Sequence, residues 1–174
     1  MTNFSGDALF LNRNDINTDE IIPARYLTAG SKAELKAHLL EDLKIDGFDP
    51  RVDIKGKGVI ITRSNFGCGS SREHAVWALE INGIGMVIAE SFARIFYRNM
   101  FACGLLAVQL PADAIAAIFT GFAGQKAAVA ADLATGKVTI SAGDRSRNDP
   151  FVLSDFDKAL LASGGWVNHA DAHY

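Results

Sequence analysis

The chain has 174 residues, of which 49% are hydrophobic and 21% are charged, and its formal net charge is -3. This size allows a core of its own, so we expect residues 1–174 to form a single domain. The weak negative charge supplies no basic field for nucleic acid or anionic lipid. No apolar run reaches the roughly 18 residues of a membrane span, so we expect neither nucleic acid nor membrane as a partner.

The cysteines and the chain ends suggest a reduced protein. Cys68 and Cys103 are too few for a disulfide framework and lack the paired spacing of metal ligands. The N-terminus lacks the basic-then-apolar pattern of a signal peptide, so we expect a cytoplasmic location. A His-x-Asp-x-His pattern at residues 169–173 could chelate a metal, but a flexible tail over about 166–174 is the simpler interpretation.

The N-terminal part predicts strands around a polar loop. Residues 8–11 form a short apolar run, residues 20–22 read Glu-Ile-Ile, and the segment between them is rich in Asp and Asn. A helix is predicted to begin at Ser31, because Ser31 and Glu34 have the spacing of a capping box.

The middle of the chain alternates predicted strands and helices. A β-branched run predicts a buried strand at residues 58–62, and apolar runs predict further strands at residues 86–89 and 105–110. Helices are predicted to begin near Ser70 and at Ser91, and a third helix begins at Pro111. This alternation implies right-handed crossovers and parallel pairing of the strands.

The last third of the chain predicts a different pairing. Residues 127–133 and 137–141 flank Thr135-Gly136, which is typical of a hairpin turn. A final helix is predicted over residues 155–163, ended by two glycines. The elements together predict an α/β fold with a mixed, partly parallel sheet.

The most informative stretch for function is residues 65–74, which follow a predicted buried strand. Gly67 and Gly69 allow the backbone to turn sharply and to approach a ligand closely. The helix expected after them would point its free N–H groups and positive dipole end at this loop. The end of a parallel strand is also where open α/β sheets usually bind ligands.

Three polar side chains follow these glycines. Ser70 and Ser71 supply hydroxyls, and Arg72 supplies a planar guanidinium that matches a carboxylate. The pattern Ser70-x-x-Glu73 is also a capping box, so a simple helix cap beside a tight turn is the structural alternative. A cation in the first helical turn opposes the helix dipole, and Arg72 therefore favours an anion site.

Residues 65–75 resemble the substrate-binding signature of the aconitase superfamily swivelling domain, in its isopropylmalate isomerase branch. Residues 15–27 and 91–99 are similar to two further segments of that family, in the same order and with the same spacing. The resemblance extends from near residue 8 to Gly164-Gly165.

This resemblance implies a three-layer β/β/α swivelling domain that acts with a partner. A separate large subunit would carry the 4Fe-4S cluster, so this chain would bind no cofactor or metal itself. The assembled hydro-lyase would dehydrate a small 2-hydroxy dicarboxylic acid and rehydrate it at the neighbouring carbon, interconverting 2-isopropylmalate and 3-isopropylmalate in leucine biosynthesis. An apolar face intended for the large subunit could drive self-association of the lone chain.

The resemblance also implies roles for individual residues. Ser70 would be the catalytic base that removes a carbon-bound proton, and Arg72 would bind a substrate carboxylate. Gly69 and Ser71 would complete the substrate-binding loop.

A second segment would select the substrate. Tyr26, Leu27 and Thr28 correspond to the family's specificity loop, while Asp19 and Thr18 would support the site. Relatives that accept an extra carboxylate, such as homoaconitase, have an arginine after the Tyr-Leu pair, and isopropylmalate isomerases usually have an apolar residue there. Thr28 is neither, and without a cation a third carboxylate would be buried unpaired.

Two alternatives remain open at this point. The chain could be the small subunit of a related dehydratase acting on 2,3-dimethylmalate, homoaconitate or another malate derivative. It could also be a stand-alone dicarboxylate-binding or regulatory module that uses the same glycine loop without chemistry.

Overall fold

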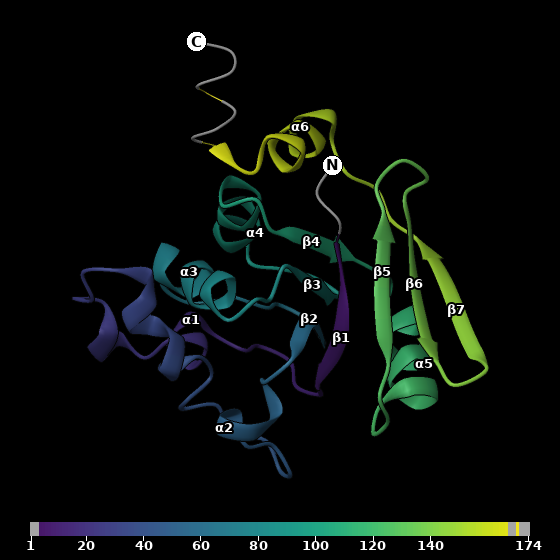
Figure 1. Ribbon diagram of the computed structural model, residues 1–174, viewed down its shortest axis with the longest axis horizontal. Coiled ribbons are helices and arrows are strands. Elements are labelled where there is room, and N and C mark those ends of the chain that lie inside the picture. Colours follow the sequence, from purple (N-terminus) through teal and green to yellow (C-terminus); the bar gives the residue numbers. More distant parts are fainter. Residues whose placement is uncertain (1–3, 167–169, 171–174) are drawn as a thin grey trace.

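The computed structural model describes residues 4–166 and residue 170 (Figure 1). The tail pattern at residues 169–173, formed by His169, Asp171 and His173, lies outside the described residues. Within the described residues, the strands form one sheet in the order β4-β3-β2-β1-β5-β6-β7. The strands are β1 (Phe4–Leu11), β2 (Lys57–Thr62), β3 (Met86–Ala89), β4 (Leu106–Gln109), β5 (Ala128–Asp132), β6 (Lys137–Ala142) and β7 (Arg145–Pro150).

Helices cover this sheet unevenly. In Figure 1, α3 and α4 lie over the parallel strands, α5 packs beside β6, and α6 lies next to α4. The helices are α1 (Thr18–Ile21), α2 (Pro50–Asp53), α3 (Glu73–Ile81), α4 (Arg94–Ala102), α5 (Ala112–Phe122) and α6 (Asp155–Ser163), with 3-10 helices η1 (Ala24–Tyr26) and η2 (Lys32–His38). The mixed α/β fold predicted from the sequence is therefore confirmed.

The strands β1 to β4 form a parallel half of the sheet. Every residue of β3 is buried, and the last four residues of β2 are buried as well. Such strands have both faces covered, so continuous apolar runs are what this position requires. The predicted strands and parallel pairing in this part are correct.

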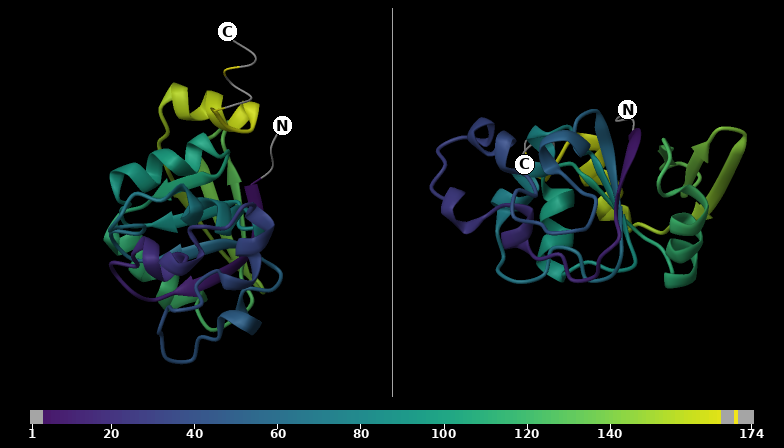
Figure 2. Two further views of the ribbon diagram at one scale, coloured as in Figure 1. Left: turned by 90° about the vertical axis from the view of Figure 1, so that its left-hand side faces the viewer. Right: turned by 90° about the horizontal axis from the view of Figure 1, so that it is seen from below.

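The strands β5 to β7 form an antiparallel half, which stands to one side together with α5 in Figure 2. The predicted hairpin over β5 and β6 and the predicted final helix α6 are both present. The sequence did not predict β7, whose residues are almost all polar.

The two halves join at β1, which changes partner along its length. Residues 4–7 pair antiparallel with β5, and residues 7–11 pair parallel with β2, with a register shift between Asp7 and Ala8. Gly6 and Gly58 allow the two backbones to come close, because a Cβ on Gly6 would lie 2.8 Å from the Gly58 Cα. The sheet curls at this junction (Figure 2).

The predicted strand over residues 20–22 is wrong, because residues 20 and 21 belong to the short helix α1 and Ile22 is its C-cap residue. Asn17 caps the helix by accepting a hydrogen bond from the Glu20 amide at 2.9 Å. The Glu20 carboxylate accepts in turn from the Asn17 amide at 3.2 Å. This reciprocal pair is a capping box, with Asn in place of Ser or Thr.

Two predicted helix caps are also wrong, although the helix predicted from Ser31 is present as the 3-10 helix η2, with Ser31 at its N-cap position. Ser31 forms no cap bond with the 3-10 helix η2, and the Glu34 carboxylate accepts instead from the Gly30 amide at 3.0 Å. Ser91 lies before α4, and its hydroxyl accepts a hydrogen bond from the Asn65 amide at 2.8 Å. The Ser91 side chain therefore fixes the loop after β2 and caps no helix.

Candidate active site

Residues 65–72, which we call the glycine loop, lie at the carboxyl end of β2, beside the segment that follows β1. The Gly67 amide donates to the Ile16 carbonyl at 2.8 Å, and the Thr18 amide donates to the Cys68 carbonyl at 2.8 Å. These two bonds hold the loop against the start of α1.

The segment after β3 closes the other side of the loop. The Phe66 amide donates to the Ser91 carbonyl at 3.1 Å, and the Ala93 amide donates to the Phe66 carbonyl at 3.0 Å. The Phe66 ring is buried and meets Phe96 of α4 edge-on, with 5.3 Å between the ring centroids. Three segments that are distant in sequence therefore meet at one edge of the parallel half, where ligands bind in such sheets.

The loop geometry requires both glycines. Gly67 has a φ of +81°, and a Cβ added there would lie 2.2 Å from Phe96 Cγ. Gly69 has a φ of +92°, in the region that side chains rarely adopt. The sharp turn is thus fixed by backbone conformation at both positions and by close packing at Gly67.

The helix predicted to begin near Ser70 begins three residues later, at Glu73, with Arg72 at the N-cap position. Thr18, which is 2% exposed, donates its hydroxyl to the Ser70 carbonyl at 2.8 Å and so holds Ser70 outside the helix. The predicted capping box is therefore wrong. Ser70 and Ser71 are both exposed, and the Ser70 hydroxyl is not used as a cap.

Arg72 is held by an acidic neighbour. Its Nη1 lies 3.3 Å from Asp19 Oδ1, and its side chain is 19% exposed. The same Asp19 oxygen accepts a hydrogen bond from the Ala24 amide at 2.7 Å. Because Asp19 is 60% exposed, this ion pair is weak and open to competition from another carboxylate.

A cavity of about 250 Å³ lies beside these residues. The residues that line it come from the glycine loop, from α1 and from the start of α4. They are Thr18, Gly67, Gly69, Ser71, Arg72, Ala93, Arg94, Ile95 and Phe96. The structure therefore brings four of the predicted site residues to one cavity, namely Thr18, Gly69, Ser71 and Arg72. Sequence reasoning missed Arg94 and Ile95, although the segment containing them had been singled out.

Tyr26, Leu27 and Thr28 do not line this cavity. The Tyr26 ring stacks on His38, with centroids 3.8 Å apart and an interplanar angle of 12°. Arg25 lies over the same ring and pairs with Asp42 at 2.9 Å, which lowers the pKa of that carboxyl group. The predicted specificity loop is thus anchored to residues 38–42, and Arg25 is directed toward Asp42.

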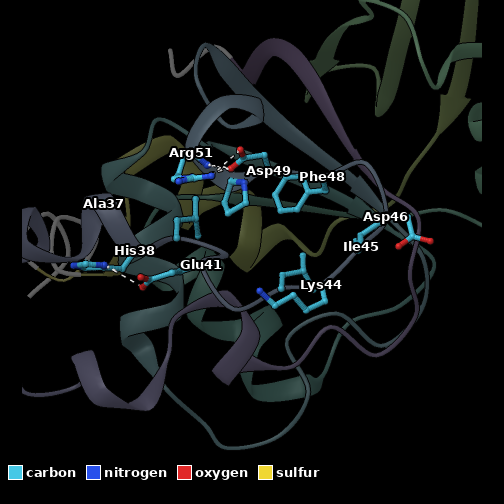
Figure 3. Close-up of a pocket in the computed structure, with 12 residues that line it drawn as sticks. Ala37, His38, Glu41, Lys44, Ile45, Asp46, Phe48, Asp49 and Arg51 are labelled. Atoms are coloured by element: carbon cyan, nitrogen blue, oxygen red, sulfur yellow. Dashed lines mark hydrogen bonds and ion pairs between the residues drawn. The ribbon is translucent and has the colours of Figure 1, made fainter.

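A different cavity, of about 710 Å³, lies among residues 37–51 (Figure 3). Two pairs of its charged side chains contact one another, His38 with Glu41 at 3.1 Å and Arg51 with Asp49 at 3.2 Å. None of the predicted site residues lines it.

Neither cysteine has the features of an activated thiol. Cys68 and Cys103 are free and half-buried, and burial raises the pKa of both, that of Cys103 to about 11.

In the part of the chain that the structure describes, no three His, Cys, Asp or Glu side chains gather at a common point that could hold a metal ion. In the same part, every helix is too short or too polar to cross a bilayer.

Comparison with known proteins places this geometry in a family. The aconitase C-terminal domain family matches residues 3–113. The chain is 39% identical over 166 residues to the 2,3-dimethylmalate dehydratase small subunit of Eubacterium barkeri, covering 95% of each chain. It is 42% identical over 161 residues to a 3-isopropylmalate dehydratase small subunit of Deinococcus deserti, covering 92% of this chain and 83% of the relative.

A solved structure agrees with these sequence relationships. The crystal structure of 3-isopropylmalate dehydratase from Methanocaldococcus jannaschii is 33% identical to this chain and superposes with a TM-score of 0.79. The match covers 98% of this chain and 95% of that chain, so it includes both halves of the curled sheet.

Proposed function

This chain belongs to the aconitase C-terminal domain family, and on that premise we propose that it is the small subunit of a 3-isopropylmalate dehydratase. It works with a large subunit that carries the 4Fe-4S cluster, and it acts on a small 2-hydroxy dicarboxylic acid in leucine biosynthesis. The observation that carries the proposal is the loop of residues 67–72, which places Gly69, Ser71 and Arg72 on the lining of a cavity of about 250 Å³. Ser70 is exposed and does not itself line this cavity, but its two neighbours in the chain do. A cytoplasmic location is part of the proposal, since two free thiols suit a reducing compartment.

The first task of this chain is to bind a carboxylate. Arg72 offers a planar fork of N–H donors, and the exposed carboxylate of Asp19 is the group that a substrate carboxylate displaces. Thr18 does not contact the substrate in this scheme. It fixes the backbone of the loop by its hydrogen bond to the Ser70 carbonyl.

The second task is to move a proton. When the large subunit is bound, its cluster supplies a Lewis acid for the substrate hydroxyl. Ser70, as an alkoxide, takes the proton from the neighbouring carbon while the substrate hydroxyl group leaves, so that a carbon–carbon double bond forms. It then returns a proton to the carbon that lost the hydroxyl group, while hydroxide adds to the neighbouring carbon. A serine alkoxide is unfavourable when merely desolvated, but the free N–H groups at the start of α3 and the Arg72 guanidinium would stabilise it.

A second candidate substrate is 2,3-dimethylmalate. The relative that carries this name matches 95% of the chain, at an identity close to that of the isopropylmalate relative. Homoaconitate is less favoured, because Thr28 supplies no cation for a third carboxylate.

The test is reconstitution. The purified chain is combined with its cognate large subunit containing an intact cluster, and hydration and dehydration of both malate derivatives are measured. We expect turnover only from the assembled complex. Ser70→Ala should lower kcat by roughly 10²–10⁴-fold or more, as loss of a catalytic base does. Arg72→Ala should lower kcat/KM by at least roughly tenfold, as loss of a charge-assisted bond does.

Ser146→Ala is the matched control, because Ser146 is an exposed serine on β7, in the antiparallel half. Near-normal activity of the Ser70→Ala complex would show that the assigned base is wrong. Tight binding of dicarboxylates to the lone chain, with no turnover after assembly, would favour the stand-alone binding module instead.

A further inference from the structure

Arg94 lies beside the same cavity as Arg72. It is the first residue of α4, and Arg72 is the N-cap residue of α3. Among the described residues that line the cavity, these two arginines are the charged ones. Two arginines from two different helix starts therefore line one small cavity, and Arg94 is the more exposed of the two.

The two charges are compensated differently. Arg72 has Asp19 at 3.3 Å, whereas no ion pair within the described part of the chain includes Arg94. The first turn of α4 contains no acidic side chain, so Arg94 also lies at the positive end of a helix dipole without local compensation. The unneutralised cationic charge of the cavity is therefore that of Arg94.

The neighbouring side chain indicates what happens on assembly. Ile95 lines the cavity and is 52% exposed, so the rim next to Arg94 carries an apolar side chain. In the proposed assembly, the large subunit covers this rim. Covering the rim removes water from Arg94, and a desolvated guanidinium without an anion is costly. An anion must accompany Arg94 when the site closes.

We propose that Arg94 binds the second carboxylate of the dicarboxylic acid substrate, while Arg72 binds the first. This inference rests on the proposed function and adds the residue that selects dicarboxylic over monocarboxylic acids. A cavity of about 250 Å³ is below the size usual for drug-sized ligands, which suits a small diacid.

The test uses the assembled complex and a pair of competitive inhibitors that differ in one charge, succinate and its monoamide, succinamate. In the wild-type complex, succinate should bind more tightly. Arg94→Ala should raise the KM of the malate-derived substrate by roughly 10- to 100-fold, the effect of losing one charge-assisted hydrogen-bonded contact, with a smaller change in kcat. It should also remove most of the preference for succinate. Arg94→Lys should restore part of that preference, because it keeps the charge and loses the fork.

Arg98→Ala is the matched control, since Arg98 is an exposed arginine one turn further along α4 that does not line the cavity. If Arg94→Ala weakens both inhibitors equally, Arg94 does not recognise the second carboxylate and the inference is wrong. The inference is also wrong if the variant weakens subunit association and leaves KM unchanged, because Arg94 then pairs with an acidic group of the large subunit. An inactive wild-type complex would contradict the proposed function itself. An active complex with an unchanged Arg94→Ala variant would contradict only the role of Arg94.

Discussion

The parallel half and the antiparallel half of the sheet share β1, but their strands are connected in different ways. In the parallel half, each of β1, β2 and β3 leads through a crossover to the next strand, so these strand ends are free to continue into irregular loops at one edge. In β5 to β7, the strands are joined by tight turns at residues 133–136 and 143–144. All the residues that line the candidate cavity follow strands of the parallel half. In this chain the long crossover connections therefore supply the loops that carry the candidate site, whereas the two tight hairpin turns supply none of its residues.

Replacing one glycine in each half should reveal the largest difference between the halves in stability and activity. Gly67→Ala combines a positive φ with a clash against Phe96 Cγ at 2.2 Å, so we expect a loss of roughly 3 kcal/mol or more in the free energy of unfolding and loss of activity. Gly143→Ala also has a positive φ, of +60°, but no atom lies within 4 Å of its added Cβ. It should cost about 1 kcal/mol and leave kcat unchanged.

Urea unfolding and assays of the reconstituted complex measure both effects. Equal losses of stability and activity in the two variants would show that the tight packing described at Gly67 does not exist.

A milder pair of substitutions asks whether the halves unfold together. Ile60 on β2 and Ile140 on β6 are both fully buried, and replacement of either by Val should cost about 1 kcal/mol. We propose that the chain is one cooperative domain, so each variant should shift a single transition, observed identically by circular dichroism and by tryptophan fluorescence. Two separate transitions, with Ile140→Val moving only one of them, would divide the molecule at β1.

The smallest expected effect concerns pH. Burial raises the pKa of Cys103 from an ordinary 9.0 to about 11. Between these values the unfolded chain has released the thiol proton and the folded chain has kept it, so stability falls as pH rises from about 9 to about 11. Cys103→Ala should therefore lose less stability than the wild type over this interval.

Unfolding midpoints measured at about pH 8 and about pH 10.5 test this expectation. Because Cys103 is on the parallel half, Ile140→Val in the antiparallel half is a suitable background control. Equal alkaline losses in wild type and Cys103→Ala would show that the Cys103 thiol is accessible to water in the folded chain.

The parallel strands could be predicted because their burial leaves a simple pattern. Residues 86–89 must be apolar throughout when both faces of the strand are covered, and the sequence shows such a run. In contrast, β7 has exposed polar residues and an edge position, so its sequence alone resembles a loop. The strand is defined by its pairing with β6, which no local pattern reports.

Helix starts were harder to predict, because a capping pattern is local and the outcome depends on tertiary contacts. Ser31 and Ser70 both have Glu three residues later, yet neither caps a helix. At Ser70 the reason is a distant residue, since Thr18 binds the Ser70 carbonyl from 52 positions away. A capping box does form at Asn17 and Glu20, just where residues 20–22 had been predicted to be a strand.

The candidate site shows the same division. Gly67, Gly69 and the nearby Arg72 could be picked out from the sequence, because glycine at a sharp turn and arginine near an anion are favoured for local reasons. The structure gives both glycines a positive φ. The position of Asp19 against Arg72 and the approach of Arg94 depend on how three crossovers bring their loops together. Tyr26, Leu27 and Thr28 stay predictions as substrate-binding residues, since none of them lines the cavity. The Tyr26 ring stacks on His38 instead.

The change of partner within β1 has a consequence for synthesis on the ribosome. The first strand made can pair through residues 7–11 with β2 once residue 62 has emerged, but residues 4–7 find their partner only after residue 131 has been translated. Until then, the nascent chain presents an unsatisfied backbone segment at its very front, which is open to pairing with another molecule. Synthesis of β5 therefore ends the period in which the start of β1 can pair with another molecule. This constraint comes from the strand order and is independent of the candidate site.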